Sequence, residues 1–215
     1  MGSGNADVID EEPDFDWPKA GDLPFRSGPP WTNADMRWAR QAASDGAIAE
    51  SFKLAADLLV DGIEEGNGYS TERMFYPVAY NYRHYVELSL KVVIRLGIRL
   101  QFVESANKAL SGHDLEKLWR NARLIIEAFF PTGEREPVDA AEQIIAQFHA
   151  LDRNGQGFRY ARSKQDQTHL GNCPDLVNLL ELRKVMKGLA NFLDGCTIEL
   201  SMAADHQDEM DRDCR

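Results

Sequence analysis

Within residues 74–96, five polar or aromatic side chains are spaced so that they could act together in chemistry: Tyr80, Arg83, His84, Glu87 and Lys91. On a helix, at about 100° per residue, all five fall on one narrow stripe. The arginine of such a stripe can hold an anion, and the histidine or the glutamate can transfer a proton. One interpretation is therefore the floor of a ligand pocket. The other is a solvated row of i,i+4 ion pairs that neutralise one another, and both stay open.

The rest of the same predicted helix is almost wholly apolar or aromatic, with Tyr82, Tyr85, Val86, Leu88, Leu90, Val92, Val93 and Leu96. A helix that is apolar on most sides is covered by neighbouring elements, so we predict that it is the central helix of the fold. A polar stripe on such a helix needs partners or a solvent-filled groove, because a buried charge without a partner is unfavourable.

Two further regions carry candidate ligand-binding residues. His113 is predicted in the first turn of a helix, where the positive end of the helix dipole disfavours an imidazolium ion. It could act as a base or a hydrogen-bond donor, or it could be a structural residue. The loop from residue 153 to residue 164 interleaves cations with aromatic rings, as suits phosphate contact and base stacking, through Arg153, Phe158, Arg159, Tyr160, Arg162 and Lys164. These cations could equally pair with the chain's own carboxylates.

A candidate catalytic pair lies in the same loop. Arg162 and His169 have six residues between them. An arginine and a histidine can supply phosphate contact and acid–base catalysis for RNA cleavage without a metal ion, although such a spacing also arises by chance. The sequence has no Walker loop, zinc-type spacing, nucleophile elbow or dinucleotide fingerprint, so we expect no metal and no cofactor.

The composition is that of a soluble globular protein, with 215 residues, 43% hydrophobic and 27% charged. A net charge of −11 argues against general attraction to nucleic acid, although a local basic site is compatible with it. No apolar run is long enough to span a membrane, and the N-terminus does not resemble a secretory signal. Three cysteines without a paired framework favour a reduced, cytoplasmic protein.

The hydrophobic periodicity predicts helices throughout and no strand. Capping boxes at residues 32–35 and 111–114 begin two of them, and Pro174 begins the last. We therefore predict an all-α, up-and-down bundle of about five main helices with an irregular N-terminal segment. The expected division is an irregular or disordered segment at 1–31, a helical-bundle domain at 32–203 and an acidic tail at 204–215.

A family resemblance rests on short motifs of the central and following helices. The run from Ala79 to Lys91, then Gly97, then Gly112 to Leu115 and Leu118, resembles the HEPN superfamily (higher eukaryotes and prokaryotes nucleotide-binding). The segment Phe158-Arg-Tyr160 is also similar to one found in some members, and the resemblance covers residues 72–195. It implies a helical bundle, frequently dimeric, with roles in nucleotide binding, toxin–antitoxin systems, phage defence or RNA cleavage. Ribonuclease members usually carry a different residue where Ser163 follows Arg162 here.

Three functions follow as hypotheses. The first is a binding or regulatory bundle that takes a nucleotide-like or other anionic ligand, or a protein partner, beside the central helix and Arg159. The second is a metal-independent ribonuclease of toxin or defence type that uses Arg162 and His169, and the third is a structural interaction module. Nucleotide or RNA is the expected partner of the basic loop. Abundant apolar helix surface favours a homo-oligomer, with a dimer expected.

Overall fold

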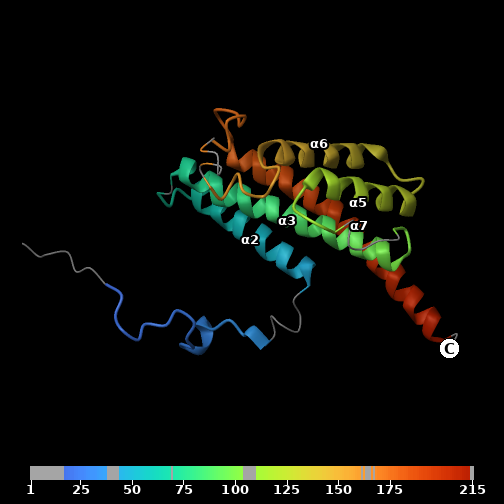
Figure 1. The fold of residues 1–215 in the computed structure, drawn as a ribbon, viewed down its shortest axis with the longest axis horizontal. Coiled ribbons are helices and arrows are strands. Elements are labelled where there is room, and N and C mark those ends of the chain that lie inside the picture. Colours follow the sequence, from blue (N-terminus) through green and yellow to red (C-terminus); the bar gives the residue numbers. More distant parts are fainter. Residues whose placement is uncertain are drawn as a thin grey trace, which may run out of the picture. The chain divides into compact units, whose positions relative to one another are not determined.

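The chain divides into two compact units, residues 1–40 and 41–215. The computed structural model describes residues 17–37, 44–68, 70–103, 110–160, 162, 166 and 168–213. Over these residues its α-helices are α2 (Asp45–Glu64), α3 (Thr71–Arg99), α5 (Leu115–Phe129), α6 (Arg135–Leu151) and α7 (Leu179–Asp213) (Figure 1). The described residues contain no strand, only one isolated bridge between Arg162 and Thr168. The predicted all-α bundle is confirmed.

The described part of the first unit, residues 17–37, is mostly irregular. Its short 3₁₀ helix η1 (Pro30–Thr32) is closed by Thr32, whose hydroxyl donates to the carbonyl of Pro29 at 2.8 Å. The side chain of Asn33 folds back onto both backbone polar groups of Gly28. Thr32 is therefore a turn residue, and the prediction that it caps a long helix is wrong.

Helix α2 begins at Asp45 in the structure. Its N-cap is Ser44, whose hydroxyl oxygen accepts a hydrogen bond from the backbone N–H of Ala47 at 3.2 Å. This contact satisfies one of the N–H groups that have no partner inside the helix. Residues 36 and 37, where the sequence predicts that this helix starts, are helical, and residues 38–43 lie outside the described residues.

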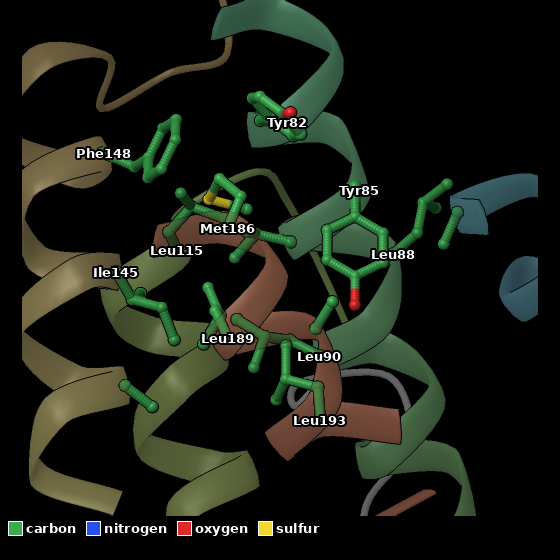
Figure 2. Packing of buried hydrophobic residues seen from close by; sticks show 14 of the residues in the cluster. Tyr82, Tyr85, Leu88, Leu90, Leu115, Ile145, Phe148, Met186, Leu189 and Leu193 are labelled. Carbon is green, nitrogen blue, oxygen red and sulfur yellow. The ribbon is translucent and has the colours of Figure 1, made fainter. Parts of the chain in front are cut away.

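Helix α3 is the centre of the bundle, as predicted, because it packs against α2, α5 and α7. Figure 2 shows its core side chains meeting those of the other helices, and the labelled residues are Tyr82, Tyr85, Leu88, Leu90, Leu115, Ile145, Phe148, Met186, Leu189 and Leu193. Near its end, Gly97 lets α5 approach closely. An added Cβ there would lie 2.4 Å from Cδ1 of Ile125, so only glycine fits.

Helix α5 starts two residues after His113. Its N-cap is Asp114, which accepts from the backbone N–H of Lys117 at 3.0 Å. The sequence had placed His113 inside the first helical turn with Ser111 as the cap, and that prediction is wrong. His113 belongs to the preceding loop, where its backbone carbonyl and ring can both reach α3.

Helix α7 begins at Leu179 rather than at Pro174. The side chain of Asn178 caps it by accepting from the backbone N–H groups of Leu180 and Glu181 at 2.9 and 3.1 Å. The helix continues to Asp213, so the described residues of the predicted acidic tail are its last turns. No helix among the described residues has the length and apolar character needed to cross a lipid bilayer.

Candidate ligand site along α3

A buried arginine organises the polar stripe of α3. The guanidinium of Arg83, with 2% of the residue exposed, donates in three directions. Its Nη1 reaches Oε2 of Glu87 at 3.0 Å, and its Nη2 reaches the backbone carbonyl of His113 at 2.7 Å. Its Nε lies 3.1 Å from both the backbone oxygen and Oδ2 of Asp152, with the hydrogen bond directed to the backbone oxygen. One side chain thus joins α3 to the segments before α5 and after α6.

Glu87 is the anionic partner shared by this stripe, and it is as buried as Arg83. Its Oε1 accepts from Nζ of Lys91 at 2.7 Å and lies 2.8 Å from Nδ1 of His113. Burial acts to raise the pKa of Glu87, but the hydrogen bonds from Lys91 and His113 outweigh it and the pKa is lowered. Glu87 is therefore a carboxylate that fixes two cationic or donating neighbours.

The loop after α6 is folded around the same guanidinium. Asp152 is buried, and its Oδ1 accepts from the backbone N–H groups of Gln156 and Gly157, each at 2.8 Å. Gly155 has a φ of +71°, and a Cβ added there would lie 3.2 Å from Nη1 of Arg83. A side chain at this position would strain the backbone and crowd the guanidinium, so glycine is required.

The inner part of the stripe is thus occupied by the chain's own charges. Arg83 and Lys91 are opposed by Glu87 and Asp152, which balances the formal charge. Such a network satisfies the requirement that buried charges be paired. The ligand-binding roles predicted for Arg83, Glu87 and Lys91 stay predictions, and the contacts give each residue a structural role.

An exposed histidine from the loop before α5 lies beside the stripe in a fixed orientation. The side chain of His113 is 64% exposed, while its Nδ1 contacts the buried Glu87 carboxylate and its carbonyl accepts from Arg83. A carboxylate at Nδ1 favours the tautomer that carries its proton there, which gives Nε2 the lone pair. His113 can therefore accept a hydrogen bond or a proton from a bound group.

His84 lies on α3, about one turn before Glu87, and is surrounded by aromatic rings. Its ring stacks on that of Tyr80 at 5.9 Å between centroids and meets the edge of Phe52 at 4.4 Å. Burial lowers the pKa of His84 below its usual value and outweighs the opposing effect of Glu87. The ring is therefore neutral near pH 7.

This shift predicts that part of the stability is lost in acid. The folded state keeps His84 neutral, whereas the unfolded chain protonates near pH 6.5, so the unfolded state binds more protons below that pH. The stability that neutral His84 contributes is fully present above about pH 6.5, and it is lost as the pH falls towards the pKa of the folded state. We expect the urea midpoint to fall less between pH 7.5 and pH 5 in His84→Gln than in the wild type. His206→Gln, at an exposed position of α7, should leave the wild-type fall unchanged.

The loop after α6 carries an exposed cation, Arg159. Its guanidinium lies 5.8 Å from the ring centroid of Tyr80 and 5.7 Å from that of Tyr160, and its Nε donates to the carbonyl of Gly155 at 2.8 Å. Within the part of the chain that the structure describes, no carboxylate pairs with it. Two tyrosine rings and one hydrogen bond to the backbone thus hold an exposed cation in place.

Comparisons with protein families, with curated proteins and with solved structures find no match. Among the described residues, no group of three or more histidine, cysteine, aspartate or glutamate side chains is arranged to hold a metal ion.

Among the described residues, no contact joins the predicted catalytic pair to this network. Arg162 is exposed and pairs with Asp166, whose Oδ2 lies 3.0 Å from its Nη1. His169 is half-buried in the following turn, and the described contacts do not join the two side chains. Their catalytic role stays a prediction.

Two groups that shape the site were not among the predicted site residues. Asp152 supplies the second carboxylate beside Arg83, and Gly155 leaves room for the guanidinium. Their positions in a glycine-containing polar loop gave a weak signal, because nothing in the local sequence shows which helix such a loop covers. Tyr80 belonged to the predicted stripe, and its role as a platform for Arg159 and His84 appears only in three dimensions.

Proposed function

We propose that this protein is a HEPN-like helical bundle that binds a nucleotide-like or other anionic ligand in a regulatory role. The observation that carries the proposal is the exposed Arg159 guanidinium held between Tyr80 and Tyr160. An arginine fixed in this way offers a planar pair of donors to a phosphate or carboxylate with little further loss of side-chain freedom.

The surrounding groups suit such a ligand. Tyr160 presents an exposed aromatic surface on which a base could stack, and stacking does not depend on the identity of the base. His113 adds an exposed acceptor or, when protonated, a donor, and the network through Arg83 links its backbone to the loop that carries Arg159. We further propose a cytoplasmic homodimer acting in a toxin–antitoxin or phage-defence setting, as the family resemblance implies.

The proposal predicts a ligand-dependent stabilisation that requires Arg159. With ATP, GTP and inorganic pyrophosphate as probes, at least one should raise the melting temperature in differential scanning fluorimetry. Arg159→Gln should weaken that binding by about 10- to 100-fold, because one charge-assisted hydrogen-bonding group is removed.

The matched control is Arg120→Gln, which removes an exposed arginine from α5. It should leave the response to the probes unchanged. If both variants lost the probe-induced rise in melting temperature equally, the probe would be binding through the overall charge of the protein and not through the Arg159 site. Metal-independent RNA cleavage that is lost in both Arg162→Ala and His169→Ala would favour the ribonuclease alternative instead.

A further inference from the structure

A concave site lies where the turn between α5 and α6 meets the middle of α7. It is a groove of about 430 Å³. Its lining is largely apolar and includes Ile126, Phe130, Pro131, Val138, Phe192 and Cys196. Cys196 is buried, and burial raises the pKa of its thiol to about 11, which is consistent with an apolar wall.

The charged residues that line this groove are mostly acidic. They are Glu127, Glu134 and Glu199, with Arg135 as the only cation among them. Arg135 itself forms an ion pair with Glu127, with 3.4 Å between Nη1 and Oε1. The groove therefore combines an apolar floor with a net negative rim.

The apolar surface continues beyond the groove along α7. At about 100° per residue, Gly195, Ile198 and Met202 lie within roughly 60° of one another on that helix. Gly195 lines the groove, while Ile198 and Met202 are 58% and 64% exposed. Exposed aliphatic residues at this spacing, next to a concave apolar site, are typical of a helix-docking surface.

The charge beyond this surface has the same sign as the groove. The last turns of α7, residues 205–213, carry five aspartates and glutamates and one arginine. Arg99 of α3 pairs with two of them, Asp205 and Asp208, at 2.8 and 2.6 Å. The remaining carboxylates extend the negative rim towards the end of the helix.

We propose that the groove and the adjoining face of α7 bind a basic amphipathic helix of a partner protein. Its apolar side chains would enter the groove and cover Ile198 and Met202, and its lysines or arginines would face Glu134, Glu199 and the end of α7. The absence of a side chain at Gly195 lets a helix backbone come close. This site is separate from the Arg159 site and does not depend on the function proposed for it.

The charge of the chain itself favours a different protein as the occupant. Residues 1–40 carry eight aspartates and glutamates against four lysines and arginines, and the whole chain has a net charge of −11. A second copy would therefore bring like charge to this acidic rim, which opposes its docking in this groove.

The chain offers a matched pair of variants to test this. A Cβ added at Gly195 or at Gly188 meets no atom within 4 Å, so both α7 positions accept a larger side chain without a clash at the backbone. Of these two glycines, Gly195 lines the groove and Gly188 does not. Gly195→Phe should fill the groove, while Gly188→Phe changes the same helix outside it.

The measurement is fluorescence anisotropy of a labelled Leu/Lys amphipathic peptide of roughly four helical turns. We expect it to bind the full chain, and a Leu/Glu peptide of the same design not to bind. Gly195→Phe should weaken binding by at least about tenfold, as for the loss of a central contact, while Gly188→Phe leaves it unchanged. Glu134→Gln with Glu199→Gln should reduce the salt dependence of binding.

Four results would overturn the proposal: no binding of the Leu/Lys peptide, equal binding of the Leu/Glu peptide, equal affinity in wild type and Gly195→Phe, or equal weakening by both phenylalanine variants. Sedimentation that shows a dimer in the wild type and a monomer in Gly195→Phe would assign the groove to a second copy, and so would also overturn it. Melting curves of both variants, expected at or above the wild-type temperature, check that the fold is intact.

Discussion

Replacing Arg83 with alanine is expected to lower the free energy of unfolding by about 3–5 kcal/mol. The substitution removes the cation opposite the buried Asp152 and one of the cations opposite Glu87. It also removes the donor to two backbone carbonyls, those of His113 and Asp152. Buried acceptors and charges that lose their partner retain the full desolvation penalty, which is why the expected loss is large.

The control is Arg183→Ala, because Arg183 also contacts two carboxylates, Asp61 and Glu64 of α2. Its side chain is 27% exposed, against 3% for Arg83, so water can solvate the groups that remain. We expect a loss of no more than about 1 kcal/mol in chemical denaturation. Losses of similar size for the two variants would contradict the role assigned to the buried network.

Conservative replacement should not rescue the site. Lysine keeps the charge of Arg83 but offers a single ammonium, which cannot reach the Glu87 carboxylate, the His113 carbonyl and the Asp152 backbone at once. Arg83→Lys is therefore expected to lose most of the same free energy. This separates a requirement for guanidinium geometry from a requirement for positive charge alone.

A single methyl group at Gly97 should destabilise the protein by about 1–3 kcal/mol through overpacking. The new Cβ would meet three atoms of Ile125, at 2.4, 2.6 and 2.8 Å, in a fully buried contact between α3 and α5. Alanine normally stabilises a helix relative to glycine by about 0.5–1 kcal/mol, and the clash should exceed this gain. Chemical denaturation of Gly97→Ala measures the net effect.

Two further variants isolate the cause. Gly188→Ala in α7, where an added Cβ meets open space, should stabilise the protein by about 0.5–1 kcal/mol. In an Ile125→Ala background the clashing atoms are absent, so Gly97→Ala should become neutral or stabilising. A loss that persists in that background would show that the crowding by Ile125 is not the reason.

The sequence was informative about the central helix because hydrophobic periodicity is a local property. The apolar circumference of residues 82–96 predicted a covered helix, and the structure has α3 in contact with three others. The stripe formed by Arg83, Glu87 and Lys91 follows from the same period, and the structure pairs Arg83 and Lys91 with Glu87.

Helix ends were less predictable because several residues compete for each cap. Ser111 and Asp114 are both good N-caps, and the structure uses Asp114, which leaves His113 outside α5. Pro174 and Asn178 both suit the start of a helix, and Asn178 accepts the hydrogen bonds. The acidic end of α7 resembled a tail, but Arg99, more than a hundred positions away in sequence, pairs with it.

The partners of Arg83 outside α3 could not be predicted, because they lie far from it in the sequence. Its bond to His113 spans 30 positions and its bond to Asp152 spans 69, and such contacts depend on how the helices pack. Local sequence gave the cation and its i,i+4 glutamate, but not the loop that covers them.

These sequence separations also determine the order in which contacts can form while the chain is being synthesised. Helices α2 and α3 are complete in the growing chain well before Asp152 is made, so at that stage Arg83 has Glu87 as its carboxylate partner but lacks the loop that encloses both. Closing a segment of this length is entropically unfavourable until α5 and α6 can pack and compensate for it. The polar centre of the bundle is therefore completed late, and chains released before residue 157 would expose a charged stripe flanked by apolar surface, which chaperones and proteases recognise.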